Sequence, residues 1–261
     1  MPPLFDIMEA YFFSFLIALI RITSFFYTAP VFGGTTVPPQ AKIGIAAIMS
    51  AIVISIKGPL PFPHPLTFMD AFLLVISEVA FGITLGYAAS LVFAGVQLAG
   101  VLIGYQMGFA VANVLDPVSN EQVSIIGQFL FLFSLLYFLT MDGHYILIKG
   151  MVDSFAVASP GSFAASEGAL AQLLIIFARM FWLGLKIATP VIGVVFLVDV
   201  ALGIVAKTVP QMNVFIIGLP LKTLLGVLVL TLAFPFLAAV MRIDFDWMAE
   251  SIYTLMHAIA S

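Results

Sequence analysis

The chain has 261 residues, of which 63% are hydrophobic and only 8% are charged, with a formal net charge of −4. Soluble proteins carry about 25% charged residues, so lipid or other apolar protein must cover most of this chain. The sequence offers no basic patch for nucleic acid and no cysteine for disulfides or thiolate metal sites. Met1–Glu9 contains two acidic residues and no Lys or Arg, so it does not resemble a cleavable signal, and the first apolar stretch is expected to be retained.

Two apolar runs separated by a loop open the chain. The run from Ala10 to Ala29 is long enough to cross a bilayer. Glycines and prolines in Pro30–Gln40 predict a loop. The next run, Ile43–Ile56, is short for a free-standing span of about 20 residues, so a re-entrant or protein-buried helix fits it. The four prolines of Gly58–Pro65 exclude helix there.

The region Phe68–Ala112 is apolar almost without pause. At about 1.5 Å per residue, one straight helix of this length exceeds any bilayer. We therefore expect a hairpin, a broken helix or a helix that leaves the membrane, with Gly95–Gly100 as the best candidate for a break. The polar stretch Asn113–Gln122 ends this region, a further span follows at Val123–Met141, and Tyr145–Ala158 is weakly amphipathic.

The main internal boundary is expected at Ser159–Gly168, which is rich in Ser, Gly, Ala and Pro. Ala169–Val209 is a second over-long apolar region, and Pro190 is placed to kink or break it. After a turn, Val214–Met241 is another span, and the tail Arg242–Ser261 has the pattern of an amphipathic helix. Its apolar residues at helical spacing are Phe245, Met248, Ile252, Leu255 and Ile259.

Small residues recur every four positions in two rows. Residues four apart lie on one helical face, and glycine there lets two helix backbones touch. Packing within the chain and packing against another subunit both fit these rows. The first row is Gly82 and Gly86, continued by Ser90 and Ala94, and the second is Gly100, Gly104 and Gly108.

Six charged residues lie within apolar runs. Such a charge costs at least about 2.5–3.5 kcal/mol at a bilayer centre, so each is expected to pair, to reach the interface or to face water. Interhelical or intersubunit pairing is favoured over a proton or ion relay. Arg179 and Lys186 share a face, and Asp199 and Glu78 are natural counter-charges. The six are Arg21, Glu78, Arg179, Lys186, Asp199 and Lys222.

The segment Gly104–Pro117 is apolar and glycine-containing, with a polar exit at Asn113 and Asp116. Gly108 and Pro117 argue against regular helix throughout. Irregular backbone at membrane depth is tolerated only where protein buries it or water lines it, which suggests a pore-lining or plugging loop. A plain extramembrane turn fits the same residues equally well.

No catalytic set stands out. The Asp142-Gly143-His144 tripeptide best fits a polar turn, because one His and one Asp are too few for a metal site. An intramembrane aspartyl protease needs two membrane Asp residues, and Asp199 is the only good candidate. We expect a non-enzymatic channel or assembly subunit with no cofactor and no metal. A stand-alone secondary transporter or ion channel is the alternative, suggested by Pro190, Pro220 and the membrane charges.

Four stretches together resemble the FliR family, the membrane subunits of the flagellar type III export gate, whose virulence-system counterpart is SctT. They cover most of the chain in the family's order, the length fits, and the last stretch favours the flagellar branch. The stretches are Arg21 through Ala29-Pro30 to Val37-Pro38; Gly104-Tyr105-Gln106-Met107-Gly108-Phe109 ending in Asp116-Pro117; Asp142-Gly143-His144; and Pro210-Gln211-Met212-Asn213-Val214-Phe215 followed by Gly218-Leu219-Pro220-Leu221-Lys222.

The resemblance implies an all-α integral membrane protein whose long, broken and re-entrant helices form FliP-like and FliQ-like hairpins of a helical hetero-oligomeric gate. Residues 1–160 would be the FliP-like part and residues 161–261 the FliQ-like hairpin with a C-terminal amphipathic helix. One copy would close a ring of FliP and FliQ subunits in the bacterial inner membrane, at the flagellar basal body. FlhB would wrap the cytoplasmic side, unfolded flagellar export substrates would pass through the pore, and membrane lipid would surround the gate.

The resemblance also implies roles for particular residues. A loop that plugs the closed pore matches Gln106 to about Glu121, with Phe109, Val111 and Val114 as its apolar plug residues by position. The glycine rows would become intersubunit contacts, and the membrane charges intersubunit pairs. The plug-loop residues are Gln106, Met107, Gly108, Phe109, Val111, Asn113, Val114, Asp116 and Pro117, and those of the FliQ-like turn are Pro210, Gln211, Asn213 and Phe215.

Overall fold

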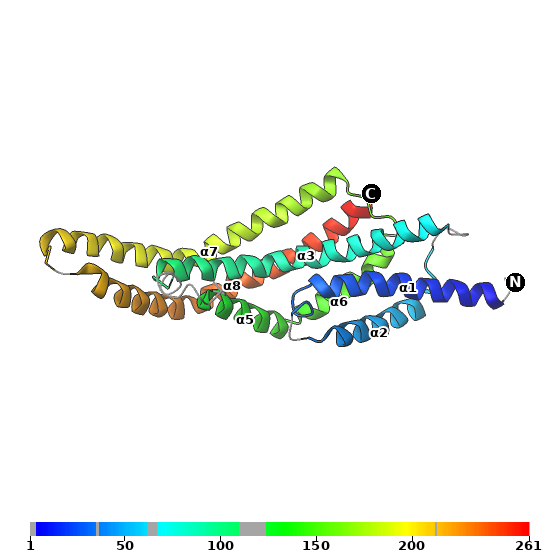
Figure 1. Ribbon diagram of the computed structural model, residues 1–261, viewed down its shortest axis with the longest axis horizontal. Coiled ribbons are helices and arrows are strands. Elements are labelled where there is room, and N and C mark those ends of the chain that lie inside the picture. The colour runs from blue at the N-terminus through cyan, green and yellow to red at the C-terminus, as the bar shows by residue number, and fades with distance from the viewer. Residues whose placement is uncertain (1–3, 35–36, 62–66, 110–123, 212, 261) are drawn as a thin grey trace. The chain divides into compact units, whose positions relative to one another are not determined.

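The computed structural model describes residues 4–34, 37–61, 67–109, 124–211 and 213–260, and the regular structure within these ranges is all helical (Figure 1). Five of the described helices are long and apolar enough to cross a membrane, and the bent pair α5–α6 could supply a sixth span. The expected all-α membrane architecture is therefore confirmed. The helices are α1 (Leu4–Thr28), α2 (Pro39–Lys57), α3 (Phe68–Gln106), α5 (Ile125–Thr140), α6 (Gly143–Val157), α7 (Glu167–Thr208) and α8 (Val214–Ala260).

Local chemistry explains where the second and third helices begin and end. Pro39 opens α2, where its missing N–H costs no helical hydrogen bond. The helix stops at Gly58, whose φ of 77° is the left-handed conformation that glycine adopts without strain. At the start of α3, the Thr67 hydroxyl accepts a hydrogen bond from the Asp70 N–H (3.2 Å), and the Asp70 carboxylate accepts the Thr67 N–H (3.1 Å). These reciprocal bonds satisfy two donors that have no partner inside the helix.

The over-long apolar regions form single helices. α3, α7 and α8 have 39, 42 and 47 residues, or about 58, 63 and 70 Å at about 1.5 Å per residue. Each is about twice as long as a bilayer's hydrocarbon core, which is about 30 Å thick. α7 also continues through Pro190, and the tail expected after Met241 is the continuous end of α8.

The break predicted at Gly95–Gly100 is wrong, because α3 passes through it without interruption. Away from water, an opened helical turn would leave N–H and C=O groups without partners, which costs more than the weak helix propensity of glycine. These glycines instead allow close contacts. A Cβ at Gly95 would lie 2.7 Å from the Met180 carbonyl oxygen of α7, and one at Gly100 would lie 2.5 Å from the Gly127 Cα of α5.

The chain divides into two compact units that share the three long helices. The first unit comprises residues 1–91, 139–177 and 246–261, and the second comprises residues 92–138 and 178–245.

The core of the first unit forms where α1 packs on α2 and α3. α1 and α2 lie side by side in the blue part of the ribbon (Figure 1). The first glycine row packs within the chain, because a Cβ at Gly82 would overlap the Ser24 side chain and the Arg21 carbonyl of α1. A Cβ at Gly86 would likewise overlap the Thr28 side chain. The C-terminal part of α8 completes this core with the buried side chains of Met248, Ile252, Leu255 and Ile259. Phe245, the fifth apolar residue of the tail pattern, is also buried but belongs to the second unit.

A group of three phenylalanines forms the centre of the second unit. Phe93 of α3, Phe138 of α5 and Phe245 of α8 are buried. The ring centroid of Phe93 lies 5.2 Å from that of Phe138 and 5.2 Å from that of Phe245. The centroids of Phe138 and Phe245 lie 4.9 Å apart. Aromatic pairs at these separations contribute about 0.5–1.5 kcal/mol beyond their buried area. They fix α3, α5 and α8 together.

Candidate functional site

The charged residues within the apolar helices form three ion-paired centres among the described residues. The first centre joins Arg21 to Glu78. The Arg21 Nε donates to Glu78 Oε2 at 2.6 Å and its Nη2 donates to Oε1 at 3.0 Å. Both side chains are 1% exposed. This paired fork is the strongest geometry available to arginine and a carboxylate. It links α1 to α3.

The rest of the Arg21 guanidinium is also occupied. Its Nη1 donates to the Ser154 and Ala158 carbonyl oxygens of α6 and the following residue, at 3.3 and 3.2 Å. Its Cζ lies 4.4 Å from the centroid of the Phe81 ring and 4.5 Å from that of Phe155. Because all three guanidinium nitrogens are hydrogen-bonded, this centre holds α1, α3 and the end of α6 together.

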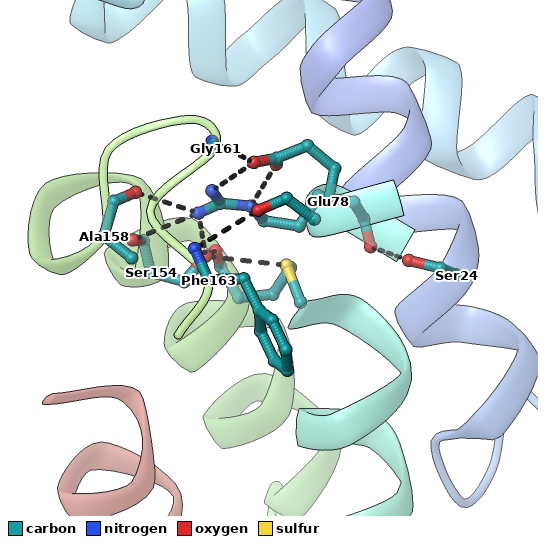
Figure 2. Close-up of polar contacts among 9 residues, drawn as sticks. Ser24, Glu78, Ser154, Ala158, Gly161 and Phe163 are labelled. Carbon is teal, nitrogen blue, oxygen red and sulfur yellow. Dashed lines mark hydrogen bonds and ion pairs between the residues drawn. The ribbon is translucent and has the colours of Figure 1, made fainter. Parts of the chain in front are cut away.

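Glu78 extends the centre to the segment before α7. Its Oε1 accepts the Gly161 N–H at 2.9 Å, and the neighbouring Ser77 hydroxyl accepts the Phe163 N–H at 3.2 Å; Figure 2 shows Glu78, Ser154, Ala158, Gly161 and Phe163 converging here. The boundary predicted at Ser159–Gly168 is therefore held by side chains of α3 rather than forming a free linker.

The second centre pairs Arg179 of α7 with Asp244 of α8. The Arg179 Nε donates to Asp244 Oδ1 at 2.6 Å, and the Asp244 side chain is 2% exposed. The sequence singled out Arg179 but not its partner. The sequence could have indicated Asp244, because it lies four residues before Met248 and therefore on the same apolar face of the tail helix, which is buried. A carboxylate on an apolar face needs a cation nearby.

The third centre joins Lys222 of α8 to Asp199 of α7, where the two side chains form an ion pair. The Gln106 Nε2 at the end of α3 donates to Asp199 Oδ2 at 3.3 Å. All three residues line a pocket of about 490 Å³ whose other walls are mostly apolar. This ion pair thus borders an open pocket, so another molecule can reach it.

The end of α3 is fastened to α8 next to this pocket. The Thr223 hydroxyl donates to the Met107 carbonyl oxygen at 3.2 Å, and the Met107 side chain is fully buried. Gly108 follows with a φ of 91°, a left-handed conformation that ends the helix. The predicted plug segment thus starts from a fixed point at Gln106–Phe109. Its other predicted residues, Val111, Asn113, Val114, Asp116 and Pro117, lie outside the described residues.

The turn between α7 and α8 lies beside the same pocket. Pro210 and Gln211 lie outside both helices, and the Asn213 side-chain oxygen accepts the Phe215 N–H at 3.2 Å. Asparagine commonly stabilises turns through such a bond two residues ahead. Phe215 is 81% exposed and lines the pocket from the first turn of α8.

The remaining predicted residues divide as follows. Gly104 faces Ser124, since a Cβ there would lie 2.9 Å from the serine hydroxyl. Lys186 has no ion pair among the described residues and lines a second groove.

The Asp142-Gly143-His144 tripeptide forms the bend of 72° between α5 and α6, where Asp142 has a φ of 56°. In the described part of the chain, no group of three or more His, Cys, Asp or Glu residues could hold a metal ion.

Helices able to span a bilayer, buried ion pairs and exposed apolar faces define a multi-pass integral membrane protein. The sequence model of the family described as "Bacterial export proteins, family 1" matches residues 12–248. The chain therefore belongs to this family, which is the family of FliR.

Relatives in three bacteria agree with this assignment. The flagellar biosynthetic protein FliR of Bacillus subtilis (strain 168) is 37% identical over 247 residues, which cover 93% of this chain and 94% of the relative. The FliR of Escherichia coli (strain K12) is 31% identical over 84% of both chains. That of Aquifex aeolicus (strain VF5) is 30% identical over 91% of this chain and 92% of the relative. The family has a general role in flagellar biosynthesis and export, and it is a family of export components rather than of known enzymes.

Proposed function

We propose that this chain is the subunit that forms, with FliP and FliQ, the pore of the flagellar type III export gate in the bacterial inner membrane. Unfolded flagellar proteins pass through this pore, FlhB lies on its cytoplasmic side, and the flagellum cannot assemble without it. The observation that carries the proposal is the family match across residues 12–248, which include most of α1 and α8 and every helix between them.

The exposed surface supports a role inside an assembly. α2 turns Ile48, Ile52 and Ile56 outward, and these side chains are 64%, 47% and 75% exposed. α3, α7 and α8 are too long for lipid alone to cover their apolar faces. Neighbouring subunits would cover the parts that extend beyond the bilayer. In this arrangement residues 1–160 take the place of a FliP subunit, and the α7–α8 hairpin takes that of FliQ.

The plug is assigned to the segment that leaves α3 after Gln106. Two features support this role for the segment as a whole. Its first residues are fastened to α8 through Met107, and Phe109 follows a glycine that ends the helix. A plug needs a fixed base, because a freely moving base would let ions pass while the gate is closed.

The test is to co-express the chain with the neighbouring FliP and FliQ genes and weigh the detergent-extracted complex by native mass spectrometry. We expect one copy of this chain in a large complex that contains several copies of both other subunits. A stable monomer or homodimer that never associates with FliP or FliQ would contradict the proposal.

One observation favours a second candidate, a stand-alone transporter or ion channel. The Asp199–Lys222 pair borders a pocket within apolar helices, as substrate and ion sites of transporters do. This candidate requires flux through liposomes that contain the purified chain alone, and the flux must be lost in Asp199→Asn. Liposomes without flux, together with a heteromeric complex, leave only the export gate.

A further inference from the structure

Lys186 differs from the other cations of the chain. Among the described residues, every other Lys or Arg either has a polar partner or is exposed, whereas Lys186 is half-buried and has no partner. It lies near the middle of α7, 19 residues after Glu167 and 22 before Thr208. A cation in such an apolar stretch is costly unless it is paired.

Both described carboxylates of the second unit, which holds Lys186, already have a cation partner. The second unit contains two described acidic residues, Asp199 and Asp244. Asp199 is already paired with Lys222, and Asp244 is paired with Arg179. The counter-charge for Lys186 is therefore not among the described residues of the second unit, and a carboxylate of another molecule can supply it.

The surroundings of Lys186 form a groove of about 420 Å³. Its walls are Trp182, Leu185, Thr189 and Pro190 of α7 and Phe236 of α8. Trp182 is 60% exposed and Leu185 is 52% exposed, so the rim is apolar and open. Side chains of another helix could fill this space while a polar group meets the ammonium.

We propose that the Lys186 groove is the docking site for a membrane-embedded helix of a partner subunit that presents a single carboxylate to Lys186. Charge complementarity selects this partner, because one ammonium in an apolar groove matches one carboxylate on an apolar helix. The inference rests on the proposed function only in that the partner is a subunit of the same complex.

The groove is a poor match for a phospholipid phosphate. A phosphate presents several acceptor oxygens, and the walls offer a single cation. The Thr189 hydroxyl already donates its proton to the Leu185 carbonyl oxygen at 2.7 Å. Pro190 has no N–H and cannot donate to the Lys186 carbonyl, so the backbone adds an acceptor to this site rather than a donor.

The experiment uses the complex co-expressed with FliP and FliQ. Lys186→Glu would place two carboxylates together, which should lower the yield of assembled complex at least about tenfold. Lys186→Met should lower it several-fold, and Lys186→Arg, which keeps the charge, should lower it least. Lys149→Glu is the matched control, because Lys149 is exposed and lies in the other unit. Its yield should equal that of the unchanged chain.

A second measurement identifies what occupies the groove. The photoreactive amino acid benzoylphenylalanine replaces Trp182, and the crosslinked product is weighed. We expect an adduct with a partner subunit, and an acidic-to-Lys change in the crosslinked helix should restore assembly of Lys186→Glu. A phospholipid adduct, or a Lys186→Glu complex that assembles as well as the Lys149→Glu control, would overturn the inference and leave the proposed function intact. A wild-type chain that forms no complex contradicts the proposed function itself.

Discussion

The side chain of Met107 fills the space that glycine leaves at position 226 of α8. A Cβ at Gly226 would lie 2.6 Å from the Met107 Cγ and 2.9 Å from its sulfur. Met107 is fully buried, and its carbonyl oxygen accepts the Thr223 hydroxyl, one helical turn before Gly226. The end of α3 is therefore fixed to α8 by a side chain and by a backbone group.

This relationship predicts the effect of Gly226→Ala. The added methyl must displace the Met107 side chain, which is flexible, so we expect a loss of about 1–3 kcal/mol in the free energy of unfolding. Thermal unfolding of the detergent-solubilised protein would measure it. Gly193→Ala is the control, because nothing lies within 4 Å of a Cβ there. Alanine should stabilise that helical position by up to about 1 kcal/mol. Equal effects at the two positions would contradict the packing described.

A larger loss is expected for Gly100→Ala. The atoms that a Cβ would meet belong to the backbone of α5, including Gly127 N at 2.7 Å and the Ile126 carbonyl oxygen at 2.7 Å. Backbone cannot rotate away as a methionine side chain can, so α3 and α5 must separate. We expect a loss of about 3 kcal/mol, at the upper end for overpacking. A Gly100→Ala protein that melts with the unchanged one would show that the second glycine row is not an intrachain contact.

The Arg21 centre predicts strong non-additivity. Arg21→Met leaves the Glu78 carboxylate buried without its cation and should cost about 3–5 kcal/mol. Removing both charges with Arg21→Met and Glu78→Met should cost clearly less than the sum of the single changes, since no buried charge remains. Unfolding of the four proteins in this double-mutant cycle gives the coupling directly. Additive losses would mean that the two side chains do not act as a pair.

The plug assignment predicts an ion leak. Phe109→Gly removes an apolar ring just after the fixed end of α3, and the closed gate should then conduct more ions in cells that carry the whole complex. Membrane potential measured with a voltage-sensitive dye would report the leak. Phe109→Tyr retains the ring and should behave like the unchanged protein. If Phe109→Gly, and also deletion within Gln106–Glu121, leaves the leak unchanged, the segment is structural and the plug lies elsewhere.

The sequence predicted most helices because apolar length and proline-rich loops carry that signal. It also predicted the tail pattern at Met248, Ile252 and Leu255, because helical spacing marks one face. The break at Gly95–Gly100 failed for a physical reason. Glycine permits a helix to bend, but within a membrane it more often permits close contact between two helices. The sequence alone does not distinguish these two roles.

The sequence did not predict which charged residues pair with each other. Asp244 is 65 residues from Arg179, and Glu78 is 57 residues from Arg21. Periodicity shows that each side chain lies on an apolar face, but it does not show which helices meet. The cost of an unpaired charge in an apolar environment was enough to predict that these residues need partners. The identity of each partner depended on the three-dimensional arrangement. The family resemblance came from motifs, and the match over residues 12–248 supports it independently of those contacts.

The interleaving of the two units determines the order in which they can be completed during synthesis. The first unit begins with α1 but includes residues 246–261, whose Met248, Ile252 and Leu255 are buried. A ribosome must therefore translate at least 245 residues before the first unit can be completed. The second unit, which ends at Phe245, is translated in full before the first, although the first unit contains the start of the chain. The apolar surface of the first unit thus stays unfinished while all of the second unit is translated.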